Sequence, residues 1–242
     1  MELDGRTALV TGAGAGIGRA VALALAREGA SVVAVDLDED AARESVELAG
    51  SGKALRADVA NDDDLRAAFA AAGRLDVLVN NAGGVSSPYF PDAPLERWSA
   101  VLDVNLRATM LGIQLALDTM RGRGGAIVNV SSIAGVGSAA HRAPEYAAAK
   151  AAVVRLTAAL APLAEHGVRV NCICPDFVDT PAARRSLELM SPEERAAAPP
   201  LVPVERVADA ILDLVRDEGL AGRVLVCPAG GDWRLLPNER GY

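Results

Sequence analysis

The stretch Leu9-Val10-Thr11-Gly12-Ala13-Gly14-Ala15-Gly16-Ile17-Gly18-Arg19 decides the fold, because an apolar run passes through glycines into a helical pattern. Glycine lets the backbone turn tightly, and the first turn of a helix offers unpaired N–H groups and the positive end of its dipole. These features hold a pyrophosphate in dinucleotide-binding βαβ units. A Gly-rich stretch also occurs as a bare structural turn, so the segments that follow must decide between the two interpretations.

Short apolar runs alternate with helical patterns along the rest of the chain, which is the order expected of βαβ units. Several runs are continuous in Val, Ile and Leu, as in strands of a parallel sheet that is covered on both faces. The expected strands are Thr7–Val10, Ser31–Val35, Ala54–Arg56, Val77–Asn80, Ala126–Val130, Arg169–Ile173 and Arg223–Val226. The expected helices are Ile17–Glu28, Asp38–Ala49, Asp62–Ala71, Leu95–Met120, Glu145–Ala164 and Val204–Arg216. The pattern predicts a single Rossmann-like α/β domain over residues 1–242, with a doubly wound parallel sheet of about seven strands.

Length and composition limit the classes of function. The 242 residues carry a formal net charge of −8, and 51% of them are apolar. Excess negative charge argues against nucleic acid or an anionic membrane surface as a partner. No apolar run reaches the length of a membrane span, and the polar start Met1-Glu2-Leu3-Asp4-Gly5 is not a signal peptide. We therefore expect a cytoplasmic protein.

The cysteines Cys172, Cys174 and Cys227 are an odd number in a Cys-poor chain. Buried thiols in a reducing cytoplasm are the default expectation, and a Cys-x-Cys metal or redox site is the alternative. A metal site would need more ligands nearby, and the only histidines in the sequence are His141 and His166. We therefore predict no metal site.

Asp36 follows the second expected strand, about twenty residues after the glycines, where a carboxylate holds the adenosine ribose hydroxyls in dinucleotide sites. The alternative role for Asp36 is a helix N-cap, although Asp38 can cap as well. A carboxylate here also repels the 2′-phosphate of NADP, and neither Ala15 nor Leu37 supplies a compensating cation. The residues favour NAD over NADP, although Arg19 can still reach a phosphate.

Tyr146 and Lys150 lie four residues apart in an expected helix, so they share one face, one turn apart. A free phenol has a pKa near ~10 and is a poor base at neutral pH, but a nearby cation stabilises the phenolate and lowers that pKa. The same spacing is common on exposed helices that have no function. The pair is a proton-transfer device only if the rest of the chain supplies a reaction that moves a proton.

The glycine spacing and the Tyr/Lys pair together resemble the short-chain dehydrogenase/reductase family, and the resemblance covers essentially the whole chain. The family's cofactor turn is matched by Thr11-Gly12 and Gly16-Ile17-Gly18, and its adenine contact by Asp58-Val59. The other motifs follow in family order: Asn80-Asn81-Ala82-Gly83, Asn105 in Asp103-Val104-Asn105-Leu106, Ser132 in Asn129-Val130-Ser131-Ser132-Ile133-Ala134-Gly135, and Tyr146 with Lys150. Each residue alone has a plain structural alternative, as a turn residue or as a side chain that satisfies nearby backbone.

The resemblance implies an NAD(H)-dependent oxidoreductase that interconverts a secondary alcohol and a ketone by hydride transfer. In the family's mechanism Tyr146 takes or gives the alcohol proton, and Ser132 hydrogen-bonds the substrate oxygen. Lys150 lowers the pKa of Tyr146 and holds the nicotinamide ribose, and Asn105 seats a water that links Lys150 to solvent. The implied catalytic residues are thus Asn105, Ser132, Tyr146 and Lys150. The cofactor-binding residues expected from the turn and the resemblance are Gly12, Gly14, Ala15, Gly16, Ile17, Gly18, Asp36, Asp58, Val59, Asn81, Ala82, Gly83, Tyr146, Lys150, Val178 and Thr180.

The loop before Tyr146 departs from the family pattern. Ser132 lies fourteen positions before Tyr146, one more than is usual in the family, which places an extra residue within Gly137–Pro144. His141 and Arg142 in this loop either read a polar or anionic substrate or face water.

Two further departures lie near the end of the chain. Asp176 stands where the family usually has Gly, and we expect its carboxylate to cap local backbone rather than to contact substrate. The tail Gly230–Pro237 carries Trp233, which packs either within the chain or on a neighbouring subunit.

The substrate pocket is expected from the segments that match the family least, which are Val85–Pro94, Gly137–Pro144 and Pro181–Pro203. The last of these is either a substrate lid or a surface excursion. The alternative functions are a non-catalytic NAD-binding regulator or scaffold of the same fold, and an NADPH-dependent reductase of 3-ketoacyl thioesters. The alanines of the Glu145–Ala164 helix permit close helix packing, and the family's assembly implies a homotetramer, with a dimer second.

Overall fold

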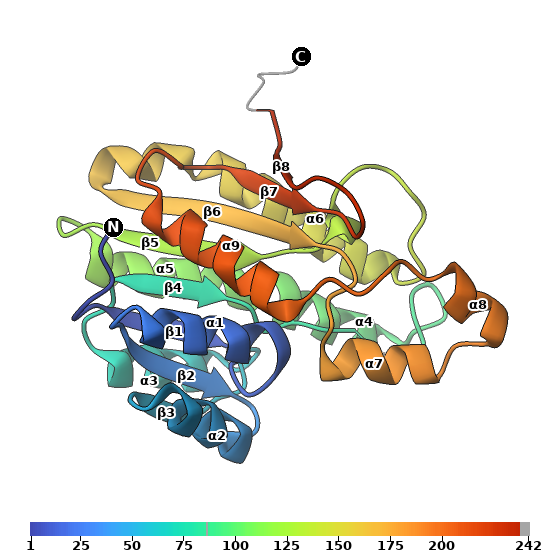
Figure 1. Cartoon of the computed structure of the whole chain (residues 1–242), viewed down its shortest axis with the longest axis horizontal. Helices are drawn as coiled ribbons and strands as arrows, with labels where there is room; N and C mark the ends of the chain where they lie inside the picture. Colours follow the sequence, from blue (N-terminus) through green and yellow to red (C-terminus); the bar gives the residue numbers. More distant parts are fainter. Residues whose placement is uncertain (86, 238–242) are drawn as a thin grey trace.

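The apolar runs of the sequence form one sheet in the computed structural model, which describes residues 1–85 and 87–237. The strands are β1 (Thr7–Thr11), β2 (Ser31–Asp36), β3 (Lys53–Arg56), β4 (Val77–Asn80), β5 (Gly125–Val130), β6 (Val168–Pro175), β7 (Val224–Cys227) and β8 (Arg234–Leu235). Their order across the sheet is β3-β2-β1-β4-β5-β6-β7-β8 (Figure 1). The seven expected strands are all present and parallel, and the short β8 pairs with β7 in the antiparallel direction.

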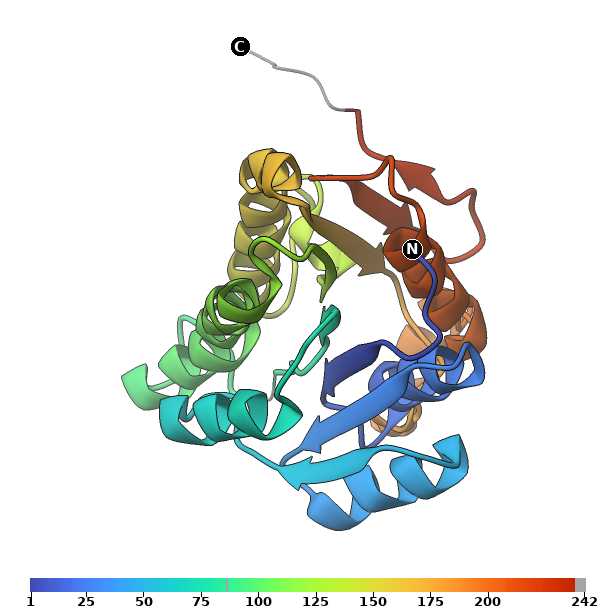
Figure 2. The same cartoon turned by 90° about the vertical axis from the view of Figure 1, so that its left-hand side faces the viewer.

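Helices cover both faces of the sheet, as Figure 2 shows. They are α1 (Gly16–Arg27), α2 (Glu39–Ala49), α3 (Asp62–Ala72), α4 (Leu95–Leu102), α5 (Ala108–Met120), α6 (Pro144–Ala159), α7 (Pro181–Glu188), α8 (Pro192–Ala197) and α9 (Val204–Arg216). Helices α1, α2 and α9 lie on one face, and α3, α5 and α6 lie on the other (Figure 2). This arrangement confirms the predicted single-domain, doubly wound Rossmann-like fold.

The core is two apolar layers, because successive residues of a strand point to opposite faces of the sheet. Val10, Val79 and Val128 pack in the layer under α1 and α9. Leu9, Leu78 and Ile127, their neighbours in the chain, pack in the layer under α3 and α5. Full burial of one such side chain is worth about 1.5–3 kcal/mol. The central strands are therefore the most strongly held part of the sheet, and their carboxyl ends are firm supports for a site.

The expected long helix Leu95–Met120 is continuous, but it changes character in the middle. α4 runs into η1 (Asp103–Arg107), a turn of π-helix, and then into α5. By length and composition this helix is apolar enough to cross a membrane, which the sequence-based expectation of no such span missed. It packs on the sheet instead, and 44% of its most apolar window is buried within the chain. Such a core helix meets the same criterion as a membrane span.

The expected helix Glu145–Ala164 ends early. α6 stops at Ala159, and the chain continues as the tighter 3-10 helix η3 (Ala161–His166). Pro162 explains the change, because it has no N–H to donate and its ring clashes with the preceding turn of an α-helix.

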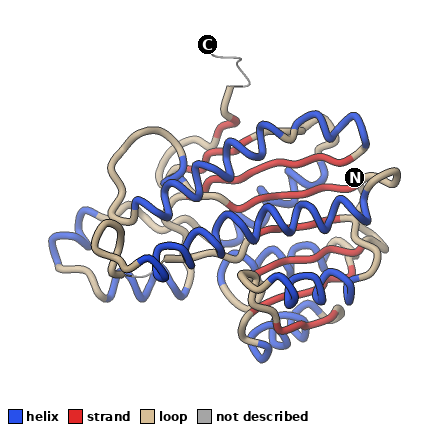
Figure 3. Tube along the Cα trace, turned by 180° about the vertical axis from the view of Figure 1, so that it is seen from behind, coloured by secondary structure: helices blue, strands red, loops and turns tan. Residues whose placement is uncertain are grey.

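The segment Pro181–Pro203 extends beyond the carboxyl edge of the sheet and holds two short helices, α7 and α8 (Figure 1). Viewed from behind, these helices and the loops beside them lie past the ends of the strands (Figure 3). Ser191 begins α8 with a capping box to Glu194, and neither short helix was among the expected ones. Ala183 is the one buried residue of α7.

The described part of the tail, residues 230–237, contacts the rest of the chain through Trp233. Trp233 lies against the core layer under α1 and α9, and the guanidinium carbon of Arg206 lies 4.1 Å from the centre of its ring. Of the two expectations for Trp233, the structure shows the intramolecular one.

Candidate active site

A cleft of about 690 Å³ opens at the carboxyl ends of the strands. It includes the point where the strand order reverses between β1 and β4, which is the usual ligand position in open α/β sheets. Most of the predicted residues line it: Gly12, Ala15, Gly16, Ile17, Asp36, Asp58, Val59, Asn81, Ala82, Gly83, Ser132, Tyr146, Lys150, Val178 and Thr180. Gly14, Gly18 and Asn105 do not line the cleft and are buried behind its wall.

The glycine turn leaves no room for side chains where the chain crosses itself. Gly16 has a φ of +53°, in the region that favours glycine. A Cβ added to Gly18 would lie 2.0 Å from the carbonyl oxygen of Gly12, so the start of α1 packs directly on the strand exit. The turn is thus a backbone-lined cradle at a helix N-terminus, which is the form that fits the pyrophosphate of a dinucleotide.

Asp36 is tied to the glycine turn. Its carboxylate accepts hydrogen bonds from Gly14 N at 2.7 Å and from Asp38 N at 3.1 Å. It does not cap α2, because Asp38 performs that role by accepting from Asp40 N and Ala41 N. The N-cap alternative for Asp36 is therefore wrong, and its carboxylate is fixed at the cleft wall.

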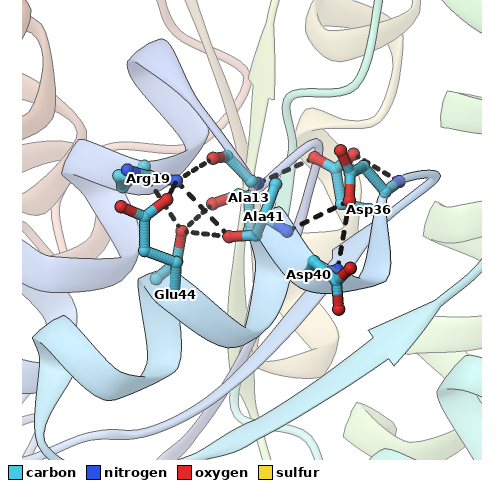
Figure 4. A network of polar contacts seen from close by, with 9 residues as sticks. Ala13, Arg19, Asp36, Asp40, Ala41 and Glu44 are labelled. Carbon is cyan, nitrogen blue, oxygen red and sulfur yellow. Dashed lines mark hydrogen bonds and ion pairs between the residues drawn. The ribbon is translucent and has the colours of Figure 1, made fainter.

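Arg19 is engaged on the far side of the same turn, as Figure 4 shows. Its guanidinium donates to Gly14 O, to Ser45 Oγ at 3.0 Å and to the carboxylate of Glu44. The Ser45 hydroxyl in turn donates to Ala13 O at 2.7 Å. The guanidinium of Arg19, which the sequence suggested as a phosphate contact, is therefore already hydrogen-bonded within the chain. Arg19 does not line the cleft.

The end of β4 is bound to the turn through Thr11 and Asn81. Thr11 Oγ1 accepts from the backbone N–H groups of Asn81 and Ala82, both at 3.0 Å. Asn81 Nδ2 donates to the carbonyl oxygens of Thr11 at 2.9 Å and Gly12 at 3.1 Å. Thr11 was not among the predicted cofactor residues, and its role is to hold two neighbouring strand ends in register.

Asp58 acts as a turn residue, which was the alternative to its expected role as a cofactor contact. Its Oδ1 accepts a hydrogen bond from Ala60 N at 2.9 Å. It also lines the cleft beside Val59.

Asn105 lies in the π-helical turn and is fully buried. Its amide donates to Gly84 O at 2.7 Å and to Val101 O at 2.8 Å, and its Oδ1 accepts from Gly84 N at 3.1 Å. The side chain therefore clamps the loop after β4 against the long helix. Isolated π-turns occur often at functional sites, but the sequence showed no sign of this one.

Tyr146 and Ser132 meet in the cleft. Both side chains line the cleft, and the ring of His141 lies 5.9 Å from that of Tyr146 between centres. Burial raises the pKa of Tyr146 above its ordinary value of 10.0, and the side chain of Ser132 offsets part of this rise.

Lys150 is buried with its Nζ 5.6 Å from the centre of the Tyr146 ring, and it donates to Val130 O at 3.0 Å. Burial lowers the pKa of Lys150 to about 8. The net effect on the pKa of Tyr146 in this structure is the rise due to burial, and the expected lowering by Lys150 stays a prediction.

Buried polar bonds that sequence analysis missed hold α6 on the sheet. Asn80 Nδ2 donates to Asn129 Oδ1 at 2.9 Å, and Asn129 Nδ2 donates to Thr157 Oγ1 at 3.0 Å. Ser131 Oγ donates to Lys150 O at 2.7 Å. Asn80, Asn129 and Ser131 stood inside the quoted motifs, whereas nothing in the sequence pointed to Thr157.

The segment after β6 brings Asp176 and Thr180 to the cleft. Asp176 Oδ2 accepts from Ala229 N at 3.0 Å, so the carboxylate does bind backbone, although the backbone is that of a segment 53 residues away and not the local one that was expected. Thr180 Oγ1 caps α7 by accepting from Ala183 N at 3.2 Å. A Cβ added to Gly16 would lie 3.0 Å from Thr180 Cγ2, so the residue that precedes α7 lies against the glycine turn.

The three cysteines are free and buried, and Cys172 Sγ lies 4.0 Å from Cys174 Sγ. Within residues 1–85 and 87–237, no group of three or more His, Cys, Asp or Glu side chains is placed to hold a metal ion.

The pocket segments are only partly those expected. Val85, His141, Arg142, Pro181, Arg185 and Ser186 line the cleft from within those segments, and Leu37 lines it from outside them. Residue 86, within the expected Val85–Pro94 segment, lies outside the described residues.

Comparison with known proteins matches residues 6–190 to the family model described as short chain dehydrogenase. The chain belongs to the short-chain dehydrogenase family. A 3β-hydroxysteroid dehydrogenase of Eggerthella lenta is 39% identical over 236 residues, covering 90% of this chain and 89% of that protein. A cyclopentanol dehydrogenase of a Comamonas strain is 34% identical over 242 residues, covering 93% and 96%.

Among solved structures, a 7α-hydroxysteroid dehydrogenase complexed with NADH and 7-oxo glycochenodeoxycholic acid is similar, with a TM-score of 0.86. It is 32% identical, and the match covers 95% of each chain. Family membership confirms the sequence resemblance and identifies the chain as an oxidoreductase.

Proposed function

We propose that this short-chain dehydrogenase interconverts a secondary alcohol and a ketone, with Tyr146 as the acid and base. The observation that carries the proposal is that Ser132, Tyr146 and Lys150 line one cleft, with Lys150 Nζ 5.6 Å from the centre of the Tyr146 ring. The names of the relatives, which act on hydroxysteroids and cyclopentanol, support the same chemistry.

A bound nicotinamide supplies the hydride acceptor or donor. Ser132 donates to or accepts from the substrate oxygen, and Tyr146 takes the hydroxyl proton in oxidation or returns it in reduction. Lys150 and Asn105 act behind this pair: the buried ammonium faces the Tyr146 ring, and Asn105 fixes the loop at Gly84. General acid–base transfer of this kind contributes about 10²–10⁴-fold to the rate.

We infer that the cofactor is NAD rather than NADP. Asp36 presents a fixed carboxylate where the adenosine ribose lies in dinucleotide sites, and the guanidinium of Arg19 is held away by Glu44 and Ser45. The carboxylate of Asp36 would also repel the 2′-phosphate of NADPH, which argues against the alternative function of an NADPH-dependent thioester reductase. The residues proposed to hold the cofactor are those of the glycine turn, Asp36, the Asp58 and Asn81 loops, Lys150, Val178 and Thr180.

The same proposal extends to the domain organisation, the cellular location and the oligomeric state. We infer a single domain over residues 1–242 with a substrate lid at Pro181–Pro203, working in the cytoplasm. The exposed alanines Ala148 and Ala151 of α6 permit close approach of a second helix, which supports a homotetramer, with a dimer as the second candidate. Light scattering at micromolar concentration measures the assembly.

The proposal is tested by NADH formation from a panel of secondary alcohols, with wild type and Tyr146→Phe. We expect the variant to lose about 10²–10⁴-fold in kcat and to bind NAD as before. A wild type that binds NAD and turns over no alcohol or ketone would favour the regulator or scaffold instead.

A further inference from the structure

The acidic side chains that line the cleft are already occupied. Each accepts a hydrogen bond from a backbone N–H: Asp36 from Gly14, Asp58 from Ala60 and Asp176 from Ala229. Their negative charge is therefore partly satisfied by backbone dipoles, and Asp36 and Asp58 lie at the end proposed for adenosine.

The basic side chains of the cleft fall into two groups. Lys150 is buried and bonded to Val130 O. Arg142 and Arg185 instead are exposed and line the cleft without an ion pair to any described carboxylate. Arg142 stands in the loop that carries the extra residue, with its guanidinium carbon 5.8 Å from the centre of the Tyr89 ring. The two cations thus come from separate segments, the loop before α6 and the lid helix α7.

The neighbour of Arg185 shows that a local carboxylate is available but is used elsewhere. Arg184 binds both oxygens of Asp179, at 2.6 and 2.9 Å, and does not line the cleft. Adjacent arginines on one short helix therefore have different surroundings: one is paired with Asp179, and the other faces the cleft uncompensated.

We propose that the substrate carries a carboxylate or similar anionic group, which Arg142 and Arg185 bind at the lid end of the cleft. The inference rests on the proposed alcohol–ketone activity and names the class of substrate for it. A guanidinium presents a rigid fork of N–H donors that matches a carboxylate, and such charge-assisted bonds are about twice as strong as neutral ones. In a chain with a net charge of −8, two arginines without ion-pair partners in the cleft also attract an anion that the rest of the surface repels.

The cofactor's own pyrophosphate is the competing source of negative charge in the same cleft. If Arg185 read that phosphate, its loss would weaken NAD binding for every substrate. If it reads the substrate, its loss affects anionic substrates alone and leaves the KM for NAD unchanged. The two assignments therefore differ in a quantity that steady-state kinetics measures directly.

The experiment compares hydroxy acids with their methyl esters, for example 4-hydroxycyclohexanecarboxylate and 3-hydroxyalkanoates of several lengths, using wild type, Arg142→Gln, Arg185→Gln and the control Arg184→Gln. We expect wild type to prefer at least one acid over its ester. We expect Arg142→Gln and Arg185→Gln each to lower kcat/KM for that acid by about 10- to 100-fold, with the ester and the KM for NAD unchanged. Arg184→Gln should change neither substrate.

Equal or better use of the ester in every pair would overturn the inference, and so would a raised KM for NAD in Arg185→Gln with no selective loss for the acid. Calorimetry of the corresponding keto acids and keto esters with the NAD-loaded enzyme separates this outcome from failure of the proposed function. Binding of an acid that needs Arg185, without any turnover, would support the anion site and refute the oxidoreductase. Absence of such binding, together with absence of turnover, would overturn both.

Discussion

The cofactor end and the lid end of the cleft are built differently. At the cofactor end, Thr11, Asp36 and Asn81 each bind backbone of a neighbouring segment, and most residues of the strands behind them are buried. At the lid end, α7 buries only Ala183, and α8 buries none of its residues. Leu189 between these helices is 89% exposed.

The difference is the one expected if the cofactor end serves the reaction and the lid end serves the choice of substrate, as proposed. Side chains that are fixed by backbone bonds need no reorganisation when the cofactor arrives, which favours catalysis by preorganised groups. A segment with few buried contacts opens at low cost in free energy, as ligand-binding lids generally do. In the functions proposed above, the chemistry thus rests on the sheet, and substrate choice rests on α7 and the loop before α6.

The largest effect on stability and cofactor binding is expected from a substitution at the cofactor end of the cleft. Gly18→Ala places a Cβ 2.0 Å from Gly12 O, a backbone atom that cannot step aside. We expect the free energy of unfolding to fall by about 1–3 kcal/mol or more, with NAD binding lost, as measured by urea unfolding and calorimetry. Gly84→Ala is the stability control, since its Cβ would meet nothing within 4 Å. A Gly18→Ala protein as stable as the control would contradict the tight crossing.

The buried ammonium of Lys150 should leave a signature in stability against pH. Its pKa is about 8 in the folded state and near 10.5 in the unfolded chain, so between these values the unfolded chain holds more protons. Stability conferred by this group therefore rises with pH across that window and is constant below it. We expect wild type to gain about 1–3 kcal/mol relative to Lys150→Met between pH 8 and 10.5.

Urea unfolding of both proteins at several pH values measures this difference, and the other titrating groups cancel in the subtraction. Parallel curves would mean that Lys150 is not desolvated as the structure indicates.

The preference for NAD over NADP tests the proposed role of Asp36 at the cofactor end of the cleft. Asp36→Ser should raise the efficiency with NADP relative to NAD by about tenfold or more, because the carboxylate no longer repels the 2′-phosphate. Adding Glu44→Gln should raise it further by releasing Arg19 from its ion pair. Glu47→Gln removes the same charge from the exposed face of α2 and serves as the matched control. If wild type already used both cofactors equally, the role of Asp36 would be refuted.

The smallest effect is expected at the lid. Asp179→Asn breaks the ion pair with Arg184, which lowers the pKa of Asp179 and lies at the surface. Exposed pairs of this kind often contribute nothing measurable to stability. We expect the midpoint of thermal unfolding to stay unchanged within error by scanning calorimetry. A clear drop would show that the lid is held more firmly than its burial suggests.

Much of the site was predictable, because its residues follow local rules. The glycine turn is predictable because glycine permits backbone conformations that other residues rarely adopt. The Tyr146/Lys150 pair is predictable because a spacing of four residues places both side chains on one face of a helix. The roles of Asp58 and Asn81 were less predictable, because their side chains first satisfy backbone in this structure. Arg185 was missed, because nothing in an Ala- and Arg-rich stretch distinguishes it from Arg184.

The sequence by itself determined the alternation of strands and helices, the doubly wound fold and the motifs of the reaction, since these depend on periodicity and on residue types at short spacing. Only the tertiary structure decided that Arg19 is occupied, that burial raises the pKa of Tyr146, and that Asn80, Asn129 and Thr157 tie α6 to the sheet. These outcomes depend on desolvation and on contacts between segments far apart in the chain. Such contacts exist only when the sheet has brought the segments together.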